Sequence, residues 1–76
     1  MNNTRRKNIA IAIEELEGIK EKIETLLEEE QEYFDNMPEN LQQSEKAEKA
    51  ENAISSLENA MDSIDESVSS LEESKD

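Results

Sequence analysis

The side chains in this sequence that could do chemistry are carboxylates, since the 76 residues include 21 Asp and Glu but no His and no Cys. Without His and Cys, nucleophile–base pairs and zinc sites lose their commonest parts. A di-metal site inside a helical bundle also uses histidines. The carboxylates recur at polar positions of helical repeats, whereas acid–base catalysis needs them in a cleft. The residue types therefore predict no enzyme, no metal ion and no cofactor.

A basic cluster near the start of the chain, formed by Arg5, Arg6 and Lys7, could bind an anion. Arginine binds phosphate groups through paired hydrogen bonds, so two clusters meeting in an oligomer would suit a nucleotide. The alternative role is structural, because cations at a helix N-terminus oppose the helix dipole and need compensation. In that case we expect Arg5 and Arg6 to pair with Glu73 and Glu72.

A candidate acidic surface is centred on Glu28, Glu29 and Glu32. Residues 9–36 contain 10 acids against two basic residues, Lys20 and Lys22. Such a surface can serve only as a solvated face, or it can imitate nucleic acid and occupy a basic cleft of another protein.

A third candidate is the tip cluster, which contains both aromatic residues and the single proline: Tyr33, Phe34, Met37, Pro38 and Leu41. Tyr, Phe and Met are enriched at the centres of protein interfaces, which favours a partner-binding patch. The same residues could instead form a plug that closes the end of a helical hairpin.

Two amphipathic helices must position these groups. Thr4 is expected to cap the first, which we place at about residues 4–35. Its apolar residues recur every three or four positions, as on one face of a helix. In a heptad assignment, the a positions are Ile9, Leu16 and Ile23, the d positions are Ala12, Ile19, Leu26 and Tyr33, and the e positions are Ile13, Leu27 and Phe34.

The second helix, at about residues 44–73, has a more regular repeat and a good N-cap in Ser44. Its expected inward residues are Ala47, Ala50, Ile54, Leu57, Met61, Ile64, Val68 and Leu71. Pro38 removes an N–H group and disfavours a helical Met37, so the first helix should end near Asp35. A short helical piece over residues 38–42 then leads into the second helix, giving a turn at about residues 36–43.

These features predict one all-α domain over residues 1–76, a two-helix antiparallel coiled-coil hairpin. Folding back around residue 39 would place Lys20 opposite Glu58, and Lys46 and Lys49 opposite Glu32 and Glu29. The wide apolar stripe of the first helix suits more than one neighbour. We therefore expect homo-oligomers, most simply a dimer that forms a four-helix bundle.

The net charge of −13 argues against direct binding of nucleic acid and of anionic membranes. No apolar run approaches the length of a membrane span, and no secretory signal is recognisable. The expected location is the cytoplasm of the cell that makes the protein.

The run from Tyr33 to Glu45, together with the basic cluster and the heptad helices, resembles short acidic proteins encoded by phages and prophages of Gram-positive bacteria. That resemblance implies a small accessory phage protein in the cytoplasm of a bacterial host. It favours binding and inhibition of a host protein with a basic surface, as an anti-defence factor. The alternatives are a sponge that sequesters a nucleotide immune signal in an oligomer interface, and a structural or assembly module.

Overall fold

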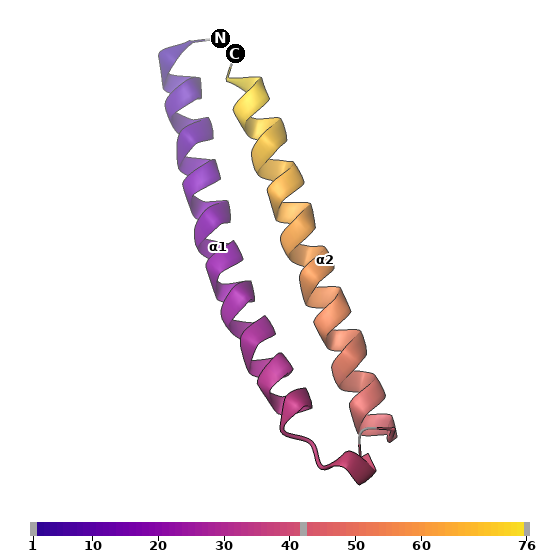
Figure 1. Cartoon of the computed structure of the whole chain (residues 1–76). Coiled ribbons are helices and arrows are strands. Elements are labelled where there is room, and N and C mark those ends of the chain that lie inside the picture. Colours follow the sequence, from indigo (N-terminus) through magenta and orange to yellow (C-terminus); the bar gives the residue numbers. More distant parts are fainter. Residues whose placement is uncertain (1, 42, 76) are drawn as a thin grey trace.

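The computed structural model describes residues 2–41 and 43–75, and the regular structure of these residues is helical, without strands. Helix α1 spans Asn3–Asp35, a 3-10 turn η1 spans Glu39–Leu41, and helix α2 spans Glu45–Ser74. The two long helices pack side by side as a hairpin, with the N and C ends together at one end (Figure 1). The result is a rod measuring 59 × 15 × 12 Å.

The cap of helix α1 lies two residues before the predicted position, so the assignment of Thr4 as the N-cap is wrong. Asn2 caps the helix instead, and its side-chain oxygen accepts a hydrogen bond of 2.7 Å from the backbone N–H of Arg5. Asparagine is among the best N-cap residues because its short side chain reaches the free N–H groups of the first turn. Thr4 lies inside the helix.

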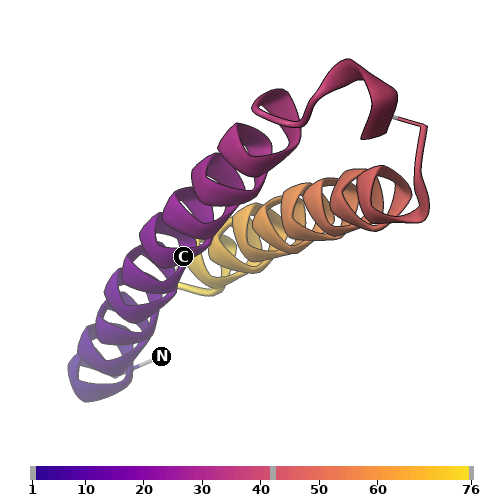
Figure 2. The ribbon, with the colours of Figure 1, turned by 90° about the horizontal axis from the view of Figure 1, so that it is seen from below.

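The tip contains the proline-dependent break that the sequence predicts. Helix α1 ends at Asp35, and the backbone N–H of Leu41 then donates to the carbonyl of Pro38 at 2.9 Å within η1. Ser44 is confirmed as the N-cap of α2, since its hydroxyl accepts from the N–H of Ala47 at 3.4 Å. Figure 2 shows the tip segment crossing from the end of α1 to the start of α2. Gln42, the last residue of the predicted short helical piece, lies outside the described residues.

The inward row of α2 is confirmed, because all eight residues predicted to face the neighbouring helix are buried or half-buried. The heptad assignment of α1 is wrong in one respect. Three d-position residues lie on the surface, with exposed fractions of 46% for Ile19, 51% for Leu26 and 50% for Tyr33. The row that turns towards α2 is buried or half-buried and comprises Ile9, Ile13, Leu16, Lys20, Ile23, Leu27, Glu30 and Phe34.

The contacts between α1 and α2 are also shifted from the predicted register, by three residues at Arg6, which contacts Lys75 rather than Glu72, and by seven residues at Lys20. Lys20 binds Asp65, with its Nζ 2.7 Å from a carboxylate oxygen, rather than Glu58. At the tip, Met37 packs with Ala47 and Ala50 in a small core cluster that Phe34 also contacts. The chain therefore continues alongside α2 past Pro38 and reverses only after η1. The predicted register assumed reversal at residue 39.

None of the predicted cross-helix ion pairs forms among the described residues. Among the described residues the ion pairs are Lys20–Asp65 and Lys75–Glu72, the second lying within one turn at 3.1 Å. Lys46 and Lys49 do not pair with Glu32 and Glu29. Exposed ion pairs are weak, so they adapt to the apolar packing rather than determine it.

Candidate functional site

The predicted tip cluster is divided between the core and the surface. Phe34 and Met37 belong to the core cluster around Ala47 and Ala50, so part of the tip is a plug that closes the hairpin. Tyr33 and Leu41 remain exposed, at 50% and 40% of their surface. With Pro38 they line a shallow hollow whose other walls come from Glu29, Glu32, Asn36, Met37 and Lys46.

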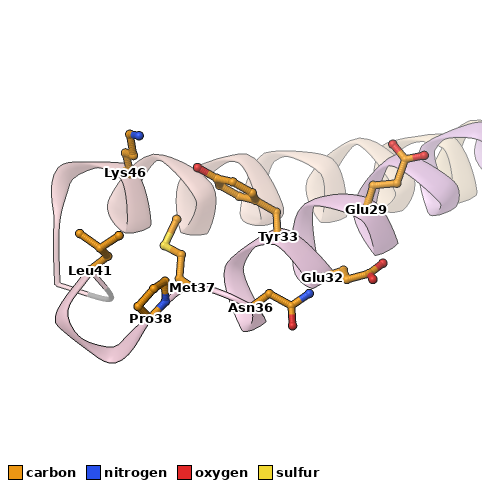
Figure 3. A pocket seen from close by; sticks show the side chains of 8 residues that line it. All are labelled: Glu29, Glu32, Tyr33, Asn36, Met37, Pro38, Leu41 and Lys46. Carbon is orange, nitrogen blue, oxygen red and sulfur yellow. The ribbon is translucent and has the colours of Figure 1, made fainter.

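Figure 3 shows how the side chains of this hollow are arranged. Tyr33 extends from α1 towards the start of α2, and Met37 points upward between Tyr33 and Leu41. Lys46 stands on α2 on the same side of the hairpin as Tyr33. This side therefore carries an exposed aromatic ring, an exposed leucine and a lysine.

The three predicted acidic residues do not share one face. Glu29 and Glu32 line the tip hollow beside Tyr33. Glu28 and Glu32 border a different hollow, which reaches Glu58 on α2. Glu32 therefore lies between the two sides of the hairpin, while Glu28 and Glu29 lie on opposite sides. A single patch formed by all three is not what the structure shows.

Acidic residues of both helices meet along the side of the hairpin that carries Glu28 and Glu58. Glu17 and Glu24 of α1 lie with Asp65 of α2 around Lys20 in a further hollow on this side. We call Glu17, Glu24, Glu28, Glu58 and Asp65 the acidic edge. The hydrogen bond from Lys20 to Asp65 raises the pKa of Lys20 above its ordinary value, and the charges of Asp65, Glu24 and Asp62 add to the effect. The one cation in this row is thereby held in its charged form.

The opposite side of the hairpin carries exposed apolar residues. The sequence-based heptad assignment had placed these residues in the core. Ile19, Leu26 and Tyr33 are seven residues apart, so they form one row along α1 on the side of the tip hollow. On α2, Ala53 and Ala60 continue the row of Lys46 at the same spacing and are half-buried. We call Ile19, Leu26, Tyr33, Ala53 and Ala60 the apolar edge. The sequence feature that indicated this edge was the width of the apolar stripe of α1, which includes a, d and e positions.

The basic cluster occupies the first two turns of α1, where Arg5, Arg6 and Lys7 are all exposed. Arg6 donates a hydrogen bond of 3.1 Å from its Nε to the backbone carbonyl of Lys75, which ties the two ends of the hairpin together. The predicted pairing of Arg6 with Glu72 is wrong, because Glu72 binds Lys75 in its own helix. Arg5 does not pair with Glu73 among the described ion pairs either. The cluster thus has one structural contact that the sequence did not predict.

In the part of the chain that the structure describes, no group of three or more Asp and Glu side chains is arranged to hold a metal ion. None of the described helices has an apolar stretch long enough to cross a membrane. No protein-family model, curated protein or solved structure matches this chain.

Proposed function

We propose that this chain is a non-enzymatic binding protein that docks on the basic surface of a host protein and inhibits it, as an accessory factor of phage type acting against host defence in the bacterial cytoplasm. The observation that carries the proposal is the acidic edge. There, carboxylates of α1 and α2 line one side of a rod 59 Å long, with Lys20 among them. A dense row of like charges on a narrow scaffold attracts a cationic cleft over a long range.

The rigidity of the hairpin supports this mode of action. The acids project from two long helices that pack on each other, so their backbone positions are set before the partner arrives. Preorganisation lowers the conformational entropy that binding would otherwise cost. A disordered acidic segment of the same composition would lose that advantage.

The finer architecture is part of the same proposal: an antiparallel coiled coil that associates further into a four-helix bundle. The support is the spacing of the buried residues and the uncovered apolar edge. The nucleotide-sponge alternative draws less support, because Arg6 of its candidate site already contacts the end of α2. A purely structural module leaves the acidic edge without a role.

The test is a pull-down from a bacterial host lysate with tagged protein, analysed by mass spectrometry for both proteins and small nucleotides. We expect a basic host protein to be captured, and the double substitution Glu24→Lys and Glu58→Lys to abolish its capture. The matched control reverses Glu66 and Glu73, two exposed acids on α2 that are not part of the acidic edge. Equal losses for the two variants would mean that net charge alone is recognised and would refute the acidic edge as a site.

A second control distinguishes the alternatives. Substitution of Arg5, Arg6 and Lys7 by alanine should leave protein capture unchanged. If the wild type instead retains a nucleotide and this variant loses it, the sponge is the correct function and the inhibitor proposal is wrong.

A further inference from the structure

The apolar edge is uncovered in the single chain, although it has the composition of an interface. Ile19, Leu26 and Tyr33 each expose about half of their surface, and all three lie on one row of α1. The matching side of α2 contains small residues, in two neighbouring rows without a single acid. These rows are Lys46, Ala53, Ala60 and Ser67, and Lys49, Ser56, Ser63 and Ser70. In a chain with 21 acids, such a side is distinct from the rest of the surface.

The total surface of the chain is larger than its mass requires. Its accessible surface is 5800 Å² for 8.7 kDa, whereas a compact monomer of that mass has about 4,700 Å². The excess is of the same order as the roughly 800 Å² that each partner buries in a standard interface. The core of the single chain is correspondingly small, with Ile13, Met37, Ala47 and Ala50 as its buried apolar residues among those described.

We propose that the apolar edge is covered by the apolar edge of a second copy, with the two hairpins antiparallel and their tips at opposite ends. This inference rests on the self-association proposed above, and it specifies the face and the orientation. The second copy is favoured over a foreign partner because the edge is complementary to itself. The charges that flank it on α1 alternate in sign.

The charges that flank the exposed row select the register of this contact. Glu15, Lys22 and Glu29 follow one another at seven-residue spacing beside Ile19 and Leu26. An antiparallel contact with Ile19 beside Ile19 of the second copy places Glu15 opposite Lys22 twice. A contact shifted by half a heptad in each helix would place Lys22 opposite Lys22 and is disfavoured.

The same register matches the remaining positions of the row. Ala12 of one copy comes level with Leu26 of the other, so a small residue receives a large one. Arg5 comes level with Tyr33, where a guanidinium can stack on an exposed aromatic ring. The Ala and Ser rows of the two α2 helices let those helices approach closely. The acidic edges point outward and remain free to bind a partner.

The net charge of −13 per chain opposes association of two copies. This repulsion is weakest at the face that carries the apolar edge. The apolar edge and its flanks carry Glu15 and Glu29 against Arg5, Lys22, Lys46 and Lys49. Along the acidic edge, by contrast, five acids lie around Lys20.

Single-cysteine variants test the face directly, because the chain has no native cysteine. In the proposed dimer, Ile19→Cys lies on the twofold axis and should form a disulfide-linked dimer under mild oxidation. The matched control is Ile11→Cys, which is 51% exposed on the outer side of α1 and should stay monomeric on a non-reducing gel. Equal cross-linking of the two variants would overturn the proposal.

A charge exchange tests the register and separates self-association from a foreign partner. Sedimentation equilibrium should give a wild-type mass of twice 8.7 kDa. Lys22→Glu should weaken the dimer by at least about tenfold in Kd, and the double variant Glu15→Lys with Lys22→Glu should restore it. A monomeric wild type, or a double variant no better than Lys22→Glu, would refute the proposal.

The lysate pull-down keeps this proposal distinct from the function proposed above. If the Lys22→Glu monomer still captures the basic host protein, the acidic edge acts without the dimer. If the charge-exchange results are as expected but no host protein is captured, the dimer is supported and the inhibitor function is refuted.

Discussion

Ile13 is the most buried large side chain of the hairpin, with 6% of its surface exposed, and its truncation to alanine should be strongly destabilising. The change removes three carbon atoms, which at about 0.8 kcal/mol per buried CH₂ amounts to about 2.4 kcal/mol. The residual cavity adds to this loss, and the better helix propensity of alanine returns about 0.4 kcal/mol. We expect a net loss of about 2–3 kcal/mol in the free energy of unfolding.

That loss is large for this chain, because a core in a domain of this size rarely supplies more than about 3–5 kcal/mol. Circular dichroism at 222 nm during urea unfolding would measure it, at one fixed protein concentration. The matched control is Ile11→Ala, two residues away in the same helix and 51% exposed. The two substitutions share the propensity gain, so their difference reports packing against α2, and the control should lose less than about 1 kcal/mol.

The comparison also tests which row of α1 faces α2. If Ile13→Ala and Ile11→Ala lower the urea midpoint equally, Ile13 is not packed against α2 and the arrangement of the hairpin described above is wrong. A selective effect of Ile13→Ala supports it.

Substitutions at three further positions probe local contacts of the hairpin. Gly18→Ala should stabilise the protein by about 1 kcal/mol, because a methyl group there meets no atom within 4 Å and alanine favours the helix; a lower thermal midpoint would contradict this. Ser44→Ala should cost about 1 kcal/mol by removing the cap of α2, whereas Ser44→Asp should retain stability, and equal midpoints for the two would argue against the cap. The pKa of Lys20 is raised in the folded protein. Its contribution to the free energy of unfolding is therefore complete below the unfolded-state pKa and is lost as pH rises through the folded-state pKa. The difference in midpoint between the wild type and Lys20→Gln should therefore be constant at neutral pH and vanish in strongly alkaline buffer; a difference that persists there would have another cause.

Local sequence signals predicted the elements of the fold with good accuracy. Pro38 ends α1 near Asp35 because of its missing N–H group, and Ser44 caps α2 because its hydroxyl reaches the first turn. The inward row of α2 was also predictable, since a single apolar row leaves no choice of face. The cap of α1 was missed because Asn2 and Thr4 are both acceptable cap residues and local propensity separates them poorly.

The candidate site was less predictable, because it depends on which residues of the two helices lie together. The sequence identified the acids, the basic cluster and the aromatic tip, but it placed Glu28, Glu29 and Glu32 together. The structure separates Glu28 from Glu29 by the side of the hairpin on which each lies. Arg6 contacts a backbone carbonyl, and no side-chain pattern signals such a partner.

What the sequence by itself determined is local: two long amphipathic helices, a break at Pro38 and an excess of acids. The choice between two apolar rows in α1 was made only by the tertiary structure. Lys20 interrupts the row of Ile13, Leu27 and Phe34, so the uninterrupted row of Ile19, Leu26 and Tyr33 looked like the better core. Lysine can bury its stem and keep its ammonium group at the surface, and Asp65 lies where the Lys20 ammonium emerges. The helices therefore pack through the row that contains Lys20. The row of Ile19, Leu26 and Tyr33 stays on the surface, where it belongs to the apolar edge.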